Sequence, residues 1–307
     1  MRSLPCKTAA RLLLAAAFAM ACGCAAVDEL AKVGTAVAES QGKISKEQSQ
    51  SITRSTGALA KAAEDFTPEQ EYYIGRSVGA VIVNRYRPYR EDQANGYLNL
   101  LGQALAQASD RPETFGGYHF LVLDSDEINA FATPGGLVFV SRGMLRCCRS
   151  EDAVAAVLAH EISHVQLRHG IQSIEQSRKT EALKVLAVEG TKTFGGKELA
   201  DLTKTFESSI GDITSTLVNN GYSRGFEREA DAAAVRILSR VGYDPNALVE
   251  MLREMGKRLK PGGADFAKTH PSPISRIGDI LTLGVRGPSS PAPPARQARF
   301  QRTLGDI

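Results

Sequence analysis

The sequence predicts an α+β fold that is mostly helical and carries a small sheet. Several segments repeat apolar residues at the helical period of 3.6, whereas two short segments are rich in valine, phenylalanine and leucine. The chain has 307 residues, of which 43% are hydrophobic. That length and composition are enough to bury the core of one large or two small domains.

Two helices are expected before the sheet. In the segment FTPEQEYYIG, Thr67 stands as an N-cap and Pro68 as the first helical residue. A second helix is expected from Tyr97, in YLNLLGQALAQA. The apolar side of the first helix should carry Ile74, Val78, Val81 and Ile82.

The two β segments follow these helices. YHFLVLD (Tyr118–Asp124) and GLVFVS (Gly136–Ser141) are predicted to be strands, and the Pro-Gly-Gly sequence from Pro134 marks the turn between them. His119 lies inside the first strand. A strand histidine is more often structural than a ligand, so we leave it out of the predicted site.

The next helix carries most of the residues suited to catalysis. Ser150 is its expected N-cap, and Glu151 and Asp152 complement the positive end of the helix dipole. Nothing interrupts the helical pattern as far as Arg168, and Gly170 is a natural residue to follow the last turn.

This helix contains the pattern His-Glu-x-x-His. His160 and His164 are four residues apart, so they share one helix face and both imidazoles can reach one cation. Glu161 can approach a water molecule at that cation from the side. The pattern is typical of two zinc ligands and a general base, with the metal lowering the pKa of its water to about 7. Alone, the pattern also occurs by chance.

A third ligand would distinguish a zinc site from a chance pattern. One class takes it from the longer pattern HExxHxxGxxH, but the positions that need glycine and histidine are Leu167 and Gly170 here. That class is therefore excluded. His169 is one residue out of register, and we expect it to cap the helix end, where a cation is favourable.

The other class takes a glutamate from a later helix, and SRGFEREADAAAVRIL offers one. Glu227 and Asp231 are four residues apart and share a face, whereas Glu229 is rotated away. We assign Glu227 as the third ligand. Asp231 is expected to accept a hydrogen bond from the far nitrogen of a ligand histidine. The alternative is an exposed acidic helix start.

Residues 1–23 have the pattern of a secretory leader. Three basic residues precede ten apolar residues, too few to span a bilayer, which needs roughly 20. The following AMACGCAA is similar to a bacterial lipoprotein cleavage site. We favour Cys24 as the lipidated residue, with Cys22 as the alternative and a plain export signal cut near Ala21 as the other interpretation.

The formal net charge of +3 comes from this leader, whose loss leaves the chain near neutral. A neutral chain without a Lys/Arg run argues against nucleic acid as a partner.

Four motifs in this order resemble the M48 zinc metallopeptidases. They are INAFATPGGLVFVSRGML (Ile128–Leu145), EDAVAAVLAHEISHVQLRH (Glu151–His169), YSRGFEREAD (Tyr222–Asp231) and THPSPISRI (Thr269–Ile277). One departure is Ala153, where the family usually has an acid; it affects helix packing or charge but not the ligands. The resemblance is to the compact bacterial lipoprotein branch and implies a zincin-like α+β domain.

The resemblance also implies a substrate-binding strand. In the family, the Asn-Ala-Phe…Pro-Gly-Gly segment leads into an edge strand beside the metal, to which an extended substrate adds through main-chain hydrogen bonds. A buried core strand is the alternative. The residues expected in this role are Gly136, Leu137, Val138, Phe139 and Val140.

In THPSPISR, the family places His270 near the metal. It either stabilises the oxyanion of the tetrahedral intermediate or binds zinc as a fourth ligand and holds the enzyme latent. Arg276 is expected to organise this loop through a carboxylate, with Asp231 as one candidate.

The motifs alone imply metal-assisted amide hydrolysis with one Zn²⁺ per chain. The resemblance implies an endopeptidase of envelope quality control that cleaves unfolded or misassembled envelope proteins. The leader pattern predicts a lipid anchor on the periplasmic side, and the lack of an aspartate after either cysteine favours the outer membrane. The alternative is an envelope chaperone or assembly factor with the same fold and metal. In that case His270 or an inserted hairpin closes the site.

The remaining segments flank or interrupt the predicted peptidase domain, residues 66–286. Residues 24–65 are expected to be a helical tether, and residues 171–220 an inserted hairpin broken at Gly195 and Gly196. The Pro-rich tail, 287–307, is expected to be flexible. The cysteines at positions 147 and 148 are expected to be buried and unpaired.

Overall fold

The computed structural model describes residues 24–42, 65–177, 221–259, 270–285 and 291–307, with a few residues between 45 and 53. The chain divides into two compact units. One comprises Met1–Asp65 and Ile174–Ser209, and the other comprises Phe66–Ser173 and Ile210–Ile307. The leader and the hairpin glycines Gly195 and Gly196 lie outside the described residues. Among the helices that are described, none is long and apolar enough to cross a membrane.

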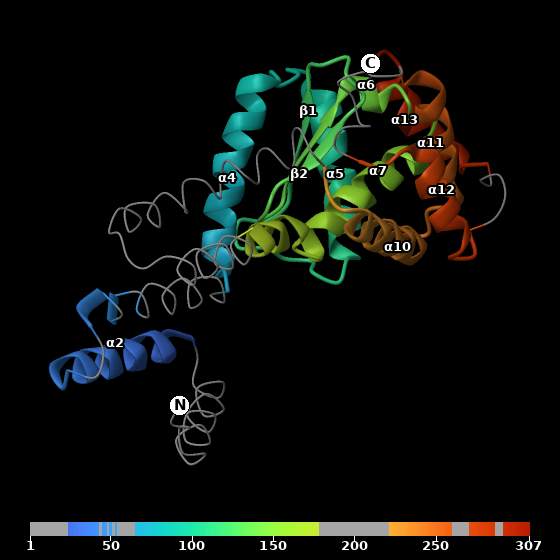
Figure 1. The fold of residues 1–307 in the computed structure, drawn as a ribbon. Coiled ribbons are helices and arrows are strands. Elements are labelled where there is room, and N and C mark those ends of the chain that lie inside the picture. Colours follow the sequence, from blue (N-terminus) through green and yellow to red (C-terminus); the bar gives the residue numbers. More distant parts are fainter. Residues whose placement is uncertain are drawn as a thin grey trace. The chain divides into compact units, whose positions relative to one another are not determined.

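The first unit contains α2 (Cys24–Ser40), which begins at the cysteine favoured for lipidation. The second unit contains the sheet and all the other elements below (Figure 1).

Helix α4 (Pro68–Arg85) begins as the sequence predicts. The Thr67 hydroxyl accepts a hydrogen bond from the Gln70 amide at 3.2 Å, and the Gln70 side chain accepts one from the Thr67 amide at 2.9 Å. Of the four residues expected on its apolar side, three are buried, but Val81 is 43% exposed. Gly75 and Gly79 are in the buried stripe instead, and this leaves Val81 at its margin.

The close approach of α4 depends on its glycines. A Cβ at Gly75 would lie only 1.7 Å from the Pro134 carbonyl oxygen, so no other residue fits without moving the chain. Helix α5 (Asp92–Gln107) begins five residues before the predicted Tyr97, because the Glu91 side chain caps it by accepting from the Gln93 and Ala94 amides.

The sheet has three strands, β1 (His119–Leu123), β2 (Ala130–Ala132) and β3 (Leu137–Ser141), in the order β1-β3-β2. Strand β3 is parallel to β1 and antiparallel to β2, with Val138 opposite Phe120 and Phe139 opposite Phe131. Both predicted strands are confirmed. The sequence did not predict β2, and the Pro134–Gly136 turn joins β2 to β3.

This order corrects the expected role of β3. The residues Gly136, Leu137, Val138, Phe139 and Val140 do not form an edge strand, because β3 is central and pairs on both sides. The edge-strand prediction is wrong, and the buried core strand is the correct alternative: the side chains of Val138 and Val140 are fully buried.

The sheet lies between two helical layers (Figure 1). On one face, α4 packs with Gly79 against the side chains of Leu137 and Phe139. On the other, Val138 and Val140 join the hydrophobic core formed with α5 and α7 (Glu151–Gln166). This alternation follows from the period-2 orientation of side chains along a strand.

Helix α7 is the centre of the fold, and each of its residues from Glu151 to Val165 is buried. Its predicted N-cap, Ser150, is confirmed by a hydrogen bond from the Ala153 amide. The short helix α6 (Arg142–Leu145) precedes it, and the two cysteines between them are buried and unpaired, as expected.

The end of α7 differs from the prediction. The helix stops at Gln166, and Arg168 adopts a left-handed conformation with φ of 55°. A helical segment, 169–177, follows directly, so Gly170 does not terminate α7.

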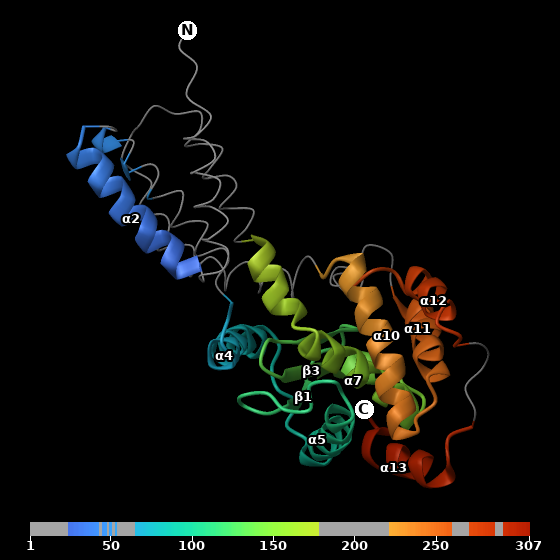
Figure 2. The ribbon, with the colours of Figure 1, turned by 90° about the horizontal axis from the view of Figure 1, so that it is seen from below.

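Three further helices pack around α7. Helix α10 (Arg224–Val241) packs along α7, and α11 (Asn246–Arg258) and α12 (Pro273–Leu281) lie beside them (Figure 2).

The C-terminal segment also belongs to this unit, so the flexible tail predicted for 287–307 is wrong for residues 294–304. They form α13 (Pro294–Leu304), whose Phe300 and Leu304 side chains enter the core. Arg299 donates two hydrogen bonds to Glu151, and Arg296 contacts Asp152 at 3.0 Å. The Pro/Ser-rich composition concealed this pairing, since it depends on acids about 145 residues earlier.

Removing one arginine of α13 should destabilise this unit. We expect Arg299→Met to lower the free energy of unfolding by about 1–3 kcal/mol, because the buried Glu151 carboxylate loses two charged donors and keeps only the hydroxyls of Tyr97 and Tyr243. Urea unfolding measures the change. Arg302→Met, on an exposed position of the same helix, is the matched control and should be neutral. Equal effects of the two substitutions would contradict the assigned role of the pair.

Candidate metal centre

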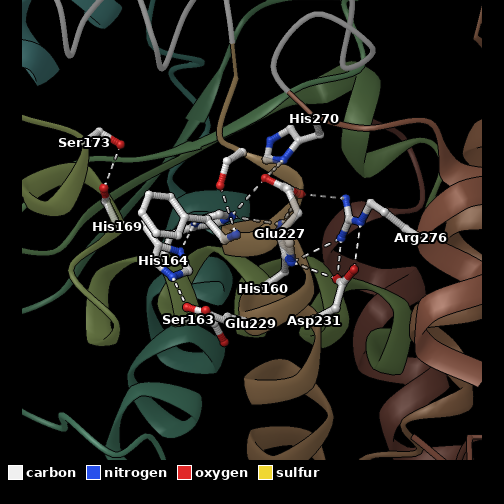
Figure 3. Close-up of polar contacts among 12 residues, drawn as sticks. His160, Ser163, His164, His169, Ser173, Glu227, Glu229, Asp231, His270 and Arg276 are labelled. Carbon is white, nitrogen blue, oxygen red and sulfur yellow. Dashed lines mark hydrogen bonds and ion pairs between the residues drawn. The ribbon is translucent and has the colours of Figure 1, made fainter. Parts of the chain in front are cut away.

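Four buried side chains from three parts of the chain converge beside α7. His160 and His164 come from α7, Glu227 comes from the start of α10, and His270 precedes α12 (Figure 3). One potential ligand atom from each lies within 4.8 Å of the others. Within the part of the chain that the structure describes, this is the cluster suited to a metal ion.

The spacing of three donors suits a small cation. Nε2 of His160 is 3.2 Å from Nε2 of His164, and each nitrogen is 3.5 Å from an oxygen of Glu227. A tetrahedral zinc ion with bonds of about 2.0–2.2 Å places its ligand atoms roughly 3.4 Å apart. In addition, Oε2 of Glu227 is buried and accepts no hydrogen bond from the described residues. A buried oxygen in this state needs a partner, and a cation would supply one.

His160 is held from behind by a buried ion pair. Its Nδ1 lies 3.0 Å from Oδ1 of Asp231, and Arg276 donates two hydrogen bonds to that carboxylate, at 2.6 and 3.0 Å. With Nε2 facing the cluster, the ring proton belongs on Nδ1, where Asp231 accepts it. The carboxylate and the guanidinium are both almost fully buried, at 1% and 3% exposure.

His164 is held by a different set of residues. Its Nδ1 lies 2.9 Å from Nδ1 of His169, whose Nε2 is 3.3 Å from Glu229. The Tyr222 ring stacks on His164, with centroids 4.4 Å apart. The expectation that His169 caps the helix end is wrong: after the left-handed residue Arg168, the buried His169 side chain contacts His164 instead.

A buried carboxylate of α4 stabilises the left-handed conformation of Arg168. Glu71 accepts a hydrogen bond from Arg168 at 3.2 Å and two from Arg111, at 2.8 and 3.1 Å. Arg168 also donates to the Phe66 carbonyl oxygen. The left-handed conformation costs a non-glycine residue about 1–2 kcal/mol, so these bonds offset a real strain.

Burial and neighbouring charges shift the ionisation of the cluster. Burial lowers the pKa of His164 to about 3. Burial and Arg276 also lower the pKa of His160, but the carboxylates of Asp231 and Glu227 outweigh them and raise it to about 9. Burial alone would raise the pKa of Glu227, yet the charge of His270 and hydrogen bonds from the histidines hold it well below its ordinary value. Glu227 is therefore anionic and available as a ligand.

The pKa of Glu161 is shifted in the opposite direction to that of Glu227. Burial raises its pKa, because few polar groups solvate the charged form. A carboxylate with a raised pKa accepts a proton more readily near neutral pH, as a general base must.

His270 completes the cluster from the side opposite Asp231 (Figure 3). Its Nδ1 lies 2.8 Å from Oε1 of Glu227, and its ring centroid is 5.5 Å from that of His160. His270 is therefore near enough to bind the same cation as Glu227. It is also near enough to donate a hydrogen bond to an oxygen atom beside that cation.

Three residues of this environment, His169, Tyr222 and Glu229, were not predicted as functional. His169 and Glu229 were set aside because neither fits a ligand spacing. Tyr222 lies in a quoted motif, but no periodicity distinguishes a ring that stacks on a histidine from one that fills the core. The left-handed Arg168 could not be foreseen either, because the sequence offers Gly170 as the simpler place to end the helix.

Removing the guanidinium behind His160 should cost stability. We expect Arg276→Met to lower the free energy of unfolding of the metal-free protein by about 1.5–3 kcal/mol, because Asp231 loses two charged donors and keeps its contact with the protonated His160 ring. Arg276→Lys should recover only part of the loss, since an ammonium cannot reproduce the two parallel hydrogen bonds. Urea unfolding at neutral pH provides the measurement, with Arg253→Met on the exposed side of α11 as control. A loss for Arg276→Met no larger than the control would contradict this account.

Comparison with known proteins agrees with the motifs. The family model for peptidase family M48 matches residues 92–283. The beta-barrel assembly-enhancing proteases of Yersinia pestis and Escherichia coli are 32% and 31% identical over 189 residues, which cover 60% of this chain. The mitochondrial metalloendopeptidase OMA1 of Schizosaccharomyces pombe is 36% identical over 163 residues, half of this chain and 42% of its own length.

The chain spans only 37% of the length of the two bacterial relatives. The family match, however, extends over more than half of this chain and includes α7, α10 and α12. The α+β fold predicted from the sequence is confirmed, and the protein belongs to peptidase family M48.

Proposed function

We propose that the protein is a zinc-dependent endopeptidase. The observation that carries this proposal is the buried triangle of His160, His164 and Glu227, whose donor atoms are spaced for one tetrahedral ion. Glu161 follows His160 in the chain, is buried, and interacts electrostatically with His160 and Glu227. Membership of family M48 supports a metal-dependent peptidase. Imidazole and carboxylate donors together favour zinc over the hard cations, which prefer oxygen ligands alone.

In this proposal, the residues of the chain divide the work between binding and proton transfer. Zinc, when bound, lowers the pKa of a water molecule to about 7 and polarises the scissile carbonyl group. Glu161 accepts the proton of the attacking water and delivers it to the leaving amine. Asp231 and Arg276 keep His160 in the tautomer that offers Nε2 to the metal.

The substrates that we propose are unfolded or misassembled proteins of the bacterial envelope. Two relatives are named beta-barrel assembly-enhancing proteases, which supports a role in the quality control of envelope proteins. The leader pattern supports export to the periplasmic side and a lipid anchor at Cys24, with Cys22 as the alternative. We further propose the outer membrane as the site of the anchor.

A second candidate function is an envelope chaperone or assembly factor with a closed zinc site. The observation that favours it is the position of His270, whose Nδ1 is 2.8 Å from the ligand oxygen of Glu227. A fourth protein ligand at this place would leave no open position for water, and the site would be latent. In an open site, the same side chain would instead donate to the oxyanion of the tetrahedral intermediate.

Replacing the general base separates these two functions. We expect Glu161→Gln to keep one zinc ion per chain and to reduce the cleavage of casein, an unfolded substrate, by about 10²–10⁴-fold, because the amide cannot accept the proton of water. Elemental analysis and a cleavage assay on the same preparation give both values. Glu175→Gln, outside the cluster, is the control. Cleavage that survives in Glu161→Gln would exclude the proposed mechanism, and wild-type protein without zinc would exclude the ligand assignment.

Replacing His270 tests the role of that residue. If His270 stabilises the oxyanion, His270→Ala should lower kcat by about 10²–10³-fold with little change in zinc content. If it is a fourth ligand, the same substitution should raise the cleavage rate from a low basal value and weaken zinc binding. The cleavage rate and the zinc dissociation constant, measured together, distinguish the two. If His270 has no role at the site, neither the cleavage rate nor the zinc dissociation constant changes.

A further inference from the structure

His169 lies outside the proposed ligand set, although its side chain is fully buried, at 0% exposure. Its Nδ1 faces Nδ1 of His164 at 2.9 Å, and its Nε2 faces Oε2 of Glu229 at 3.3 Å. His164 turns its other nitrogen, Nε2, toward His160 and Glu227. The contact with His169 is therefore made through the nitrogen that does not face the cluster (Figure 3).

These contacts fix the direction of the hydrogen bonds. Two neutral imidazoles that meet through their Nδ1 atoms can bond only if one nitrogen carries a proton and the other does not. A His164 ring that offers the Nε2 lone pair to the cluster carries its proton on Nδ1 and donates it to His169. His169 then carries its proton on Nε2 and donates to the Glu229 carboxylate.

The packing of the rings supports the same arrangement independently. Tyr222 stacks on His164 with the ring planes 17° apart, and Phe226 stacks on His169 with the planes 10° apart. Tyr222 lies just before α10 and Phe226 lies in its first turn, both close in sequence to Glu227 and Glu229. One short segment therefore supplies a proposed ligand, the ring contacts of two histidines and the terminal hydrogen-bond acceptor.

The backbone conformation also favours the contact between His164 and His169. Arg168, held by Glu71, adopts a left-handed conformation directly before His169 and so interrupts the helix. Without this interruption, a residue five positions after His164 on a continuous helix would point to a different face.

We propose that His169 and Glu229 form an outer arm of the metal centre that positions His164, as Asp231 and Arg276 position His160. This inference rests on the proposed function, since it assumes that His164 binds zinc. His169 is a positioning residue: it contacts a ligand, and its role is to orient the ring and fix its tautomer. Glu229 is 58% exposed, whereas Asp231 is buried, so water can replace Glu229 but not His169.

The test is the zinc affinity of three substitutions at position 169, measured in the full chain by competition with a chelator. We expect His169→Leu to weaken zinc binding by about 10–100-fold, because His164 loses its acceptor. His169→Asn should restore most of the affinity, since its side-chain oxygen takes nearly the place of Nδ1. His169→Gln places its amide near the position of Nε2 and should bind zinc as weakly as the leucine variant.

Two controls complete the series. His119→Leu removes an exposed imidazole that is hydrogen-bonded to the Gly116 carbonyl oxygen and lies outside the metal cluster, and it should leave the zinc affinity unchanged. Glu229→Ala should weaken binding less than His169→Leu, because water reaches that end of the arm. Long-range ¹H–¹⁵N spectra of the zinc-loaded wild type should show His169 protonated on Nε2.

The outcomes separate this inference from the proposed function. Wild type that binds no zinc overturns both. Wild type that binds zinc, with equal affinity in the Leu, Asn and Gln variants, overturns the positioning role and leaves the peptidase proposal intact. If His169→Leu fails to fold, the comparison of Asn with Gln decides, because both keep a polar amide of similar size. Equal weakening of Asn and Gln would show that His169 only fills space.

Discussion

The structure depends on the complete burial of α7, a helix that carries acids and histidines into the core. A buried charge or polar group is tolerated only with a partner, because desolvation otherwise costs several kcal/mol. Two of these partners come from distant elements: α13 supplies Arg299 to Glu151, and α10 supplies Asp231 to His160, with Arg276 of α12 bound to that acid. The outer helices therefore do more than cover apolar surface. They bring the counter-charges without which the central helix could not carry its ionisable residues.

This dependence explains what the sequence could and could not predict. Local signals worked: Thr67 and Ser150 cap helices as expected, and the i, i+4 spacing brings His160 and His164 together. The fold class followed from the same periodicities. The failures concern partners distant in sequence. No local pattern in a Pro/Ser-rich tail shows that Arg299 meets Glu151.

The central position of β3 was missed for a related reason. Its identity as a strand follows from the Val-Phe-Val run at its centre, but its place in the sheet depends on β2, whose three residues are too few to show alternation. The same limit applies to His169, since its role depends on the left-handed turn at Arg168. The conformation of Arg168 is itself stabilised by Glu71, about 100 residues earlier. Motif spacing identifies groups along one helix, whereas the environment of each group is set by tertiary contacts.

The electrostatics of the cluster suggest why a cation belongs there. Glu161, Glu227 and Asp231 are three buried acids, and Arg276 is the one permanent cation among the described side chains that contact this group. The carboxylates of Asp231 and Glu227 raise the pKa of His160 to about 9, so these acids favour a positive charge at this ring. A metal ion at Nε2 would compete with a proton for that nitrogen, so its affinity should rise with pH. The acids whose burial costs desolvation energy are thus the same groups that favour the binding of a divalent ion.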